Sequence, residues 1–297
     1  MSAAIFAFAD GARQAAALAR HCAIPIHPID VHSFPDGESL VQVHGTASTA
    51  LLYRSLDNPN AKLIELLLAA SALRDQGAGQ VILVAPYLAY MRQDTAFHKG
   101  EAVSQRVIGQ LLAGWFDGIV TVDPHLHRTA NLSEVIAGIP ALAVSAAPSL
   151  VEAIAKGLDP RTVLVGPDSE SRPWVQGIAA PLGLDILVGE KVRKGDREVA
   201  LAIPAIAMVR GRPAMLVDDM ISSGTTLIAG ARLLRAAGAK DVEAVATHSL
   251  SSAADLERLG RAGIARLRAT DSTSSPIATI PLADVLANAI RKQGWLG

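Results

Sequence analysis

Short apolar runs alternate with helical patterns along the chain, and this alternation constrains the fold more than any other feature. The apolar runs span residues 81–85, 118–122, 162–165, 214–217 and 242–246. Helical patterns lie between them, at 61–76, 104–115, 149–156 and 225–237. A strand, a helix and a second strand wind into a βαβ unit with a parallel sheet. We therefore expect an α/β protein whose sheets are mostly parallel and flanked by helices.

The two halves of the chain have similar patterns. The apolar run 81–87 is followed along the chain by Asp123-Pro124-His125, and the run 163–168 is followed by Asp218-Asp219. At 297 residues the chain is long enough for two domains of ordinary size. We expect a tandem pair of α/β domains over residues 1–143 and 144–280, and a C-terminal helix within 281–297 that packs back on the N-terminal half.

Composition narrows the class of protein. Hydrophobic residues make up 50% of the chain and aromatic residues 4%, which is typical of parallel strands covered by Ala-rich helices. A net charge of -1 gives no broad attraction for nucleic acid or anionic membranes. Cys22 is the single cysteine, which excludes an intrachain disulfide and a thiolate metal cluster. The N-terminus lacks a signal-peptide pattern, and the apolar run 199–209 is too short to span a bilayer. We expect a cytoplasmic protein with no nucleic-acid or membrane partner.

The segment 214–226 carries the strongest functional signal. A strand pattern leads into Asp218 and Asp219, then into a loop of hydroxyl residues around Gly224 and an amphipathic helix. A helix N-terminus offers unpaired N–H groups to a phosphate, Gly224 permits close approach of the backbone, and the hydroxyls add donors. The two acids lie where ligands bind in open α/β sheets, and they suit sugar hydroxyls or Mg2+. The segment predicts a sugar-phosphate site; an acidic turn before a capped helix is the alternative.

Two segments of the first half combine groups that suit a nucleotide. In residues 33–38, Phe34 can stack on a base while Asp36 or Glu38 accepts hydrogen bonds, although Pro-Asp-Gly alone predicts a surface turn. In residues 86–94, Arg92 can bind phosphate through two parallel hydrogen bonds, and Gln93 can donate to and accept from a base edge. A polar loop between a strand and a helix is the alternative for this second segment.

Two further strand ends carry acids. Asp123-Pro124-His125-Leu126-His127 follows the run 118–122, and three potential ligands there indicate a metal or nucleotide-phosphate site. Two histidines would suit zinc, but we favour Mg2+ because carboxylates dominate the other segments and no thiolate accompanies them. The loop 166–172 adds Asp168, hydroxyls and an arginine.

Residues 190–198 form a run of charged residues in an apolar neighbourhood, with Lys191 and Arg193 near its start. Most charge runs are solvated faces. A mobile cationic loop at this place would instead close over a polyphosphate and stabilise charge that develops in a transition state.

Taken in order, these segments resemble the motifs of ribose-phosphate pyrophosphokinases, the synthetases of phosphoribosyl diphosphate (PRPP), from about residue 30 to about residue 290. The loop after Asp218 alone also resembles that of phosphoribosyltransferases, which consume PRPP. The segments of the first half are therefore what point to a synthetase. The resemblance implies two tandem phosphoribosyltransferase-like domains, an ATP-binding domain at 1–143 and a ribose-5-phosphate-binding domain at 144–280.

The resemblance also assigns roles to residues. Lys191 and Arg193 match the catalytic pair of the family's mobile loop, and His125 and Asp168 match residues near its Mg2+. The residues that match the family's ATP site are Phe34, Asp36, Glu38, Arg92, Gln93, Asp94 and His125. The residues that match its ribose 5-phosphate site are Asp218, Asp219, Ser222, Ser223, Gly224, Thr225 and Thr226.

The implied reaction transfers the β,γ-diphosphoryl group of ATP, with Mg2+ as cofactor, to the anomeric hydroxyl of ribose 5-phosphate, and gives PRPP and AMP. Because the family's adenine site crosses a subunit boundary, the resemblance also implies a homo-oligomer, either a dimer or a dimer-based hexamer. Two alternatives stay open: a phosphoribosyltransferase that uses PRPP and a base, and a non-catalytic subunit associated with a synthetase. The chain departs from the common family pattern at Ser169-Glu170-Ser171, where a Gly-Gly pair is usual, and its loop 222–226 is closer to archaeal-type synthetases and to transferases.

Overall fold

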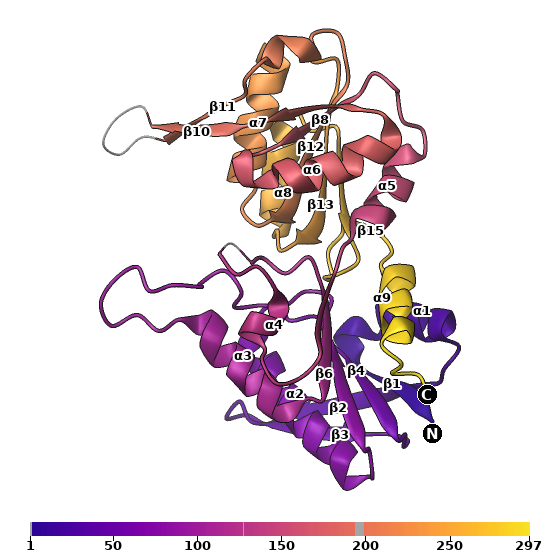
Figure 1. The fold of residues 1–297 in the computed structure, drawn as a ribbon. Helices are drawn as coiled ribbons and strands as arrows, with labels where there is room; N and C mark the ends of the chain where they lie inside the picture. Colours follow the sequence, from indigo (N-terminus) through magenta and orange to yellow (C-terminus); the bar gives the residue numbers. More distant parts are fainter. Residues whose placement is uncertain (1, 127, 194–198) are drawn as a thin grey trace. The chain divides into compact units, whose positions relative to one another are not determined.

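The computed structural model describes residues 2–126, 128–193 and 199–297 of the chain. The chain divides into two compact units, one made of Met1–Ser145 with Leu282–Gly297 and one made of Ala146–Pro281. Each unit has its own sheet, shown with its helices in Figure 1. No helix in the described ranges is both long and apolar enough to cross a membrane.

The first unit is built on a sheet whose strand order is β3-β2-β1-β4-β5-β6-β7. Neighbouring strands are parallel except β2 and β3, which form an antiparallel hairpin. The strands are β1 (Ala3–Phe8), β2 (Ile26–Ser33), β3 (Ser39–Val43), β4 (Thr49–Tyr53), β5 (Gln80–Val84), β6 (Gly118–Val122) and β7 (Ala141–Val144). The central strands β1, β5 and β6 are buried along almost their whole length, and for β5 and β6 the continuous apolar runs predicted this.

Helices cover both faces of this sheet. They are α1 (Ala12–Cys22), α2 (Pro59–Asp75), α3 (Ser104–Trp115), α4 (Leu132–Val135) and α9 (Ala283–Lys292), with the short 3-10 turn η1 (Ala9–Gly11). Figure 1 shows α2 and α3 on one side of the sheet and α1 with α9 on the other. The last helix, α9, packs against α1, β6 and β7 although it follows the whole second unit in the sequence. The C-terminus of the chain therefore completes the first unit.

The second unit is built on a sheet of parallel strands in the order β15-β14-β13-β12-β8-β9. Its strands are β8 (Val163–Gly166), β9 (Asp185–Val188), β12 (Ala214–Ile221), β13 (Val242–Ser249), β14 (Arg266–Thr270) and β15 (Ala278–Ile280). A separate antiparallel hairpin, β10 (Glu190–Arg193) with β11 (Val199–Ala202), extends from this unit in Figure 1.

The helices of the second unit are α5 (Ala147–Ala155), α6 (Arg172–Ala179), α7 (Thr225–Ala236) and α8 (Ala253–Arg261), with the 3-10 turns η2 (Ser169–Ser171), η3 (Ala180–Leu182) and η4 (Ile206–Val209). Helix α7 buries Leu227, Ala231 and Leu234, a helical spacing that forms a continuous core with β8, β12 and β13. A Cβ at Gly230 would approach the side chain of Leu216 to 2.9 Å. The small residue lets α7 lie close on β12.

The predicted α/β class is confirmed, and several predicted elements match closely. The helix predicted at 104–115 is α3 and the strand predicted at 118–122 is β6, with identical bounds. The strand predicted at 214–217 is too short, because β12 continues to Ile221. Met220 and Ile221 are buried and pair with His248 and Ser249 of β13, and this partner strand keeps the acidic pair in an extended conformation. The two acids therefore lie within the strand rather than after it.

Candidate functional site

Three acidic residues, Asp168, Asp218 and Asp219, lie toward the carboxyl ends of β8 and β12, which are neighbours in the second sheet. Asp218 and Asp219 are half-buried, and the backbone N–H of Asp219 donates to Asp218 Oδ1 at 2.9 Å. Burial raises the pKa of Asp218 well above its usual value, and the negative charges of Asp219 and Asp168 raise it further. The predicted ligand-binding acids of the second half are thus brought into one electrostatic cluster.

Asp168 follows β8 and caps the turn η2. Its Oδ1 accepts from the backbone N–H of Ser171 at 3.3 Å, and the Ser171 hydroxyl donates to the Asp168 carbonyl at 2.6 Å. A Cβ at Gly166 would lie 2.2 Å from this hydroxyl, so the close turn depends on glycine there. These contacts fix the backbone from which the Asp168 carboxylate extends.

The loop 222–226 connects β12 to α7 and presents four hydroxyl residues to solvent. Ser222, Ser223, Thr225 and Thr226 are exposed, whereas Gly224 is buried. Gly224 has a φ of 73°, and a Cβ there would lie 2.8 Å from the side chain of Leu259. The Ser223 and Thr225 hydroxyls are 3.0 Å apart at the N-terminus of α7. This arrangement can hold an oxyanion between helix N–H groups and hydroxyls.

Residues that follow β13 donate hydrogen bonds to the backbone of this loop. The Ser251 hydroxyl donates to the carbonyl of Ser222 at 2.9 Å, and Arg258 Nη2 donates to the carbonyl of Ser223 at 3.0 Å. Arg258 extends from α8, whose N-terminus is closed by a capping box between Ser252 and Asp255. Ser251 and Arg258 were not among the predicted site residues. The Ser-x-x-Asp spacing before α8 is the sequence signal that marks the start of this supporting helix.

In the first unit, the predicted base-binding residues lie on the turn between β2 and β3. Phe34, Asp36 and Glu38 are all exposed, and the Phe34 ring makes an edge contact with His32, with ring centroids 4.8 Å apart. The backbone N–H of Phe34 donates to the Glu38 carbonyl at 2.8 Å, and Gly37 provides the positive φ that closes the turn. The predicted surface turn is confirmed, and it carries an exposed ring and two exposed acids.

The segment after β5 is bound to the start of α3. The Ser104 hydroxyl donates to Gln93 Oε1 at 2.5 Å, and the backbone N–H of Gln105 donates to the Gln93 carbonyl at 3.2 Å. Arg92 is exposed, whereas the Asp94 side chain is only 3% exposed and forms an ion pair with Arg128. Within this segment, the carboxylate of Asp94 faces the protein rather than the solvent.

His125 lies in the segment that follows β6. The strand ends at Val122, and the following Asp123 adopts a positive φ of 34°, so Asp123 and His125 do not continue the strand. His125 is half-buried, and His127 lies outside the described residues. His125 belongs to the first unit and Asp168 to the second. Among the described residues, no three His, Cys, Asp or Glu side chains are grouped closely enough to form a complete metal-ligand set.

Lys191 and Arg193 lie in β10, where they pair with Leu201 and Val199 of β11. The structure describes their backbone, but their side chains lie outside its described part, as do residues 194–198 of the predicted cationic loop. The start of that predicted loop is therefore one strand of an antiparallel hairpin.

Comparison with known proteins gives matches over almost the whole chain. The model of the N-terminal domain of ribose phosphate pyrophosphokinase matches residues 3–114, and the phosphoribosyl transferase domain model matches residues 143–260. A ribose-phosphate pyrophosphokinase from Methanopyrus kandleri is 32% identical over 96% of this chain and 98% of its own length. One from Thermococcus kodakarensis is 32% identical over 90% and 93%, respectively. The crystal structure of phosphoribosylpyrophosphate synthetase from Mycobacterium smegmatis is 27% identical, with a TM-score of 0.85 over 100% of both chains.

Proposed function

The chain belongs to the ribose-phosphate pyrophosphokinase family and is an enzyme of that class, and we propose which of its residues bind each substrate and which act in the transfer. The β,γ-diphosphoryl group of MgATP is transferred to the anomeric hydroxyl of ribose 5-phosphate. The anomeric oxygen bonds to the β-phosphorus, the bond from that phosphorus to the oxygen shared with the α-phosphorus breaks, AMP leaves and the hydroxyl proton is released. The match of both family domains in one chain carries this proposal, since a phosphoribosyltransferase needs only the second.

The acceptor sugar binds at the carboxyl end of β12. The loop 222–226 holds the 5-phosphate, because it combines the N-terminus of α7 with exposed hydroxyls around Gly224. Asp218 and Asp219 are acceptors for the ribose hydroxyls. Because a carboxylate repels a phosphate, charge alone favours the phosphate at the loop and the ribose hydroxyls at the two acids.

The acid cluster also suits Mg2+. Burial and mutual repulsion of Asp168, Asp218 and Asp219 raise the pKa of Asp218, and a divalent cation would offset that repulsion. Mg2+ commonly takes only one or two protein carboxylates and completes its shell with water and substrate phosphates. Asp168 is the residue of the second unit that would hold Mg2+, and His125 is the residue of the first unit that would contact Mg2+ bound with the nucleotide. When bound, Mg2+ neutralises charge on the transferring diphosphoryl group.

ATP binds to residues of the first unit. Phe34 stacks on adenine while Asp36 and Glu38 accept hydrogen bonds, and Arg92, Gln93 and His125 contact the rest of the nucleotide. The exposed turn that carries Phe34 suits a contact with a nucleotide bound by a neighbouring copy, so we place the enzyme in a homo-oligomer. Asp94 contributes through Arg128, to which its carboxylate is bonded.

Catalysis is positioning together with charge neutralisation. Lys191 and Arg193 on the hairpin strand β10 supply positive charge to the diphosphoryl group during transfer, and no covalent nucleophile is required. The phosphorylated substrates and the single cysteine fit an enzyme of the cytoplasm.

The direct test is incubation of the purified protein with MgATP and ribose 5-phosphate. We expect AMP and PRPP in equal amounts. Pyrophosphate release from PRPP that depends on an added base would favour a phosphoribosyltransferase. Absence of AMP above background in every oligomeric fraction would rule out the synthetase and leave the non-catalytic subunit.

A further inference from the structure

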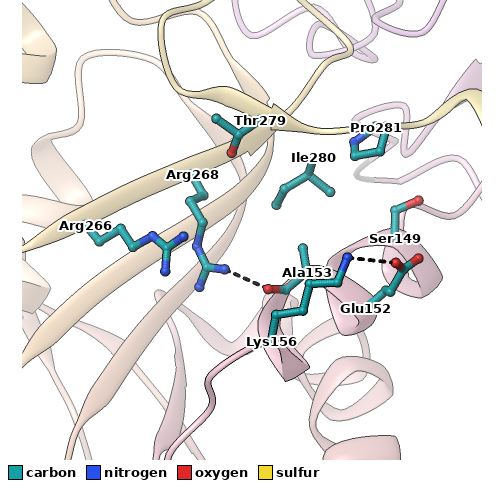
Figure 2. Close-up of a pocket in the computed structure, with 9 residues that line it drawn as sticks. All are labelled: Ser149, Glu152, Ala153, Lys156, Arg266, Arg268, Thr279, Ile280 and Pro281. Atoms are coloured by element: carbon teal, nitrogen blue, oxygen red, sulfur yellow. Dashed lines mark hydrogen bonds and ion pairs between the residues drawn. The ribbon is translucent and has the colours of Figure 1, made fainter. Parts of the chain in front are cut away.

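A cavity with polar and charged lining residues lies in the second unit, between β14, β15 and α5. Its volume is about 250 Å3, and none of its lining residues belongs to the acid cluster or to the loop 222–226. Figure 2 shows Arg266 and Arg268 extending from β14, with the Arg268 guanidinium reaching Ala153 on α5. The reaction proposed above uses none of these residues.

Arg268 is the buried cation of this cavity. Its side chain is 8% exposed, and its guanidinium donates to the Ala153 carbonyl at 2.9 Å and to Glu243 Oε2 at 3.2 Å. Its buried Nε finds no hydrogen-bond acceptor among the described residues. Burial lowers the pKa of Arg268, and the neighbouring positive charge of Arg266 lowers it further. The bond from Arg268 to the Ala153 carbonyl caps the C-terminal end of α5. This cap does not explain why the buried Nε–H of Arg268 has no acceptor among the described residues.

The charges that line the cavity favour an anion. Lys156, Arg266 and Arg268 are cationic, and the single acidic residue of the lining, Glu152, is paired with Lys156 at 3.0 Å on the exposed surface of α5. An adjoining cavity of about 310 Å3 shares the three cations and adds Lys240, but it also adds the acids Asp159, Asp241 and Glu243. The excess of positive charge is therefore greater on the side that faces α5 and β15.

The remaining lining groups suit the body of a small ester. Ser149 and Thr279 supply hydroxyls, whereas Ile280 and Pro281 supply apolar surface. The volume lies just below the range of about 300–1,000 Å3 that is usual for sites of drug-sized ligands. A phosphate group would pair with the guanidinium groups, and a few attached carbon atoms would fill the rest.

The cavity is distinct from the sugar-phosphate loop. Arg268 pairs in register with Val245 of β13, which pairs with Val217 of β12. Two strand spacings of about 4.8 Å separate β14 from β12, so Arg268 lies roughly 10 Å across the sheet from the strand that carries the acids. The loop 222–226 follows further along β12.

We propose that this cavity is a second phosphate-binding site, which takes a free phosphate or the terminal phosphate of a small monoester between Arg266 and Arg268. The ligand supplies the acceptor that the buried Arg268 Nε lacks and offsets the repulsion between the two guanidinium groups. The site lies on the α5 side of the sheet, apart from the residues proposed to hold ribose 5-phosphate.

The test measures binding of two probes, inorganic phosphate and glycerol 3-phosphate, by isothermal titration calorimetry at constant ionic strength. A Ser223→Asp background removes phosphate binding at the loop, because the added carboxylate repels the anion. We expect one saturable site per chain in this background, with affinity reduced about tenfold or more by Arg266→Ala. Arg232→Ala is the matched control, since Arg232 is an exposed arginine of α7 outside the cavity.

Tighter binding of glycerol 3-phosphate would identify a monoester as the ligand, and tighter binding of inorganic phosphate would identify the free ion; both support the site. Absence of saturable binding of either probe, or equal affinities in Arg266→Ala and Arg232→Ala, would overturn it. AMP formation from MgATP and ribose 5-phosphate, measured separately without Ser223→Asp, should be kept in Arg266→Ala. Failure of the second site and failure of the proposed enzyme function are therefore read from different assays.

Discussion

The carboxylate of Asp94 accepts two hydrogen bonds from Arg128, one from the guanidinium Nη1 at 2.7 Å and one from the backbone N–H at 3.2 Å. The Asp94 side chain is 3% exposed and the Arg128 side chain 63% exposed. The Arg128 guanidinium also lies 6.0 Å from the centre of the Phe97 ring. The buried carboxylate of Asp94 therefore holds an exposed cation in the segment that follows His125.

This pairing predicts that Asp94→Ala and Arg128→Ala have overlapping effects. Each single variant should raise KM for ATP by about tenfold, since a charge-assisted hydrogen bond contributes about 1.5–3 kcal/mol. The double variant should be little worse than the poorer single variant, because both changes remove the same interaction. Steady-state kinetics of the wild type, the two single variants and the double variant, with ATP varied and ribose 5-phosphate saturating, measure this double-mutant cycle.

Arg74→Ala is the control for this cycle. Arg74 pairs with Asp117 at 3.0 Å in the same unit, but Asp117 precedes β6 and so lies at the opposite ends of the strands. The Arg74→Ala variant should therefore leave KM for ATP unchanged. Effects of Asp94→Ala and Arg128→Ala that simply add would show that Asp94 contacts the nucleotide independently of Arg128.

Gly224→Ala should weaken the use of ribose 5-phosphate. A non-glycine residue at a φ of 73° costs about 1–2 kcal/mol, and the added Cβ would lie 2.8 Å from Leu259. The loop would have to shift, and KM for ribose 5-phosphate should rise by about tenfold or more while KM for ATP changes little. Gly177→Ala is the matched control, because a Cβ there meets no atom within 4 Å and φ is not positive. A larger effect on ATP than on ribose 5-phosphate would mean that the loop holds the donor.

Patterns local in sequence predicted the fold well, and contacts between distant residues mark where such prediction ends. Helix 104–115 and strand 118–122 follow from periodicity and burial alone. The length of β12 depended on pairing with β13, which a strand pattern ending at Val217 could not reveal. The bond from Arg258 to Ser223 joins residues 35 apart, and the bond from Arg128 to Asp94 joins residues 34 apart. The motifs pointed to the candidate segments, but only the folded chain shows which side chains support them.

Ser252→Ala tests the support that α8 gives to the phosphate loop. Loss of the N-cap should lower the free energy of unfolding by about 1 kcal/mol. Hydrogen bonds from Ser252 lower the pKa of Asp255, so the part of the stabilisation that comes from these bonds should be present above the usual carboxyl pKa and be lost as pH falls through the lowered value. Denaturant unfolding at neutral and acidic pH measures the difference in stability, and Ser252→Thr, whose hydroxyl both accepts from the Asp255 N–H and donates to its carboxylate, should recover much of the lost stability. An equal loss of unfolding free energy at every pH would show that the cap made by Ser252 does not depend on the charge of Asp255.

Lys191→Ala should lower kcat by orders of magnitude and leave the Kd for ATP nearly unchanged. A contact made mainly in the transition state contributes to turnover rather than to ground-state binding. Binding of ATP by calorimetry and turnover by AMP release give the two quantities, with Lys292→Ala on α9 as the control. Unchanged turnover would remove Lys191 from catalysis.

Asp218→Asn should separate stability from activity. The raised pKa of Asp218 means that its charged form is disfavoured in the folded chain, so wild-type stability should decline as pH rises from the usual carboxyl pKa through the raised value. Without ligand and with EDTA present, Asp218→Asn should remove this dependence and raise Tm at neutral pH, because it removes repulsion from Asp219 and Asp168. The same variant should raise KM for ribose 5-phosphate by about tenfold or more, since an amide replaces an acceptor-only carboxylate. The exposed Asp241 supplies the control Asp241→Asn, which should change neither quantity. A lower Tm for Asp218→Asn would show that the acid cluster stabilises the fold. Stability alone would then account for the burial of these acids, without a role in ligand binding.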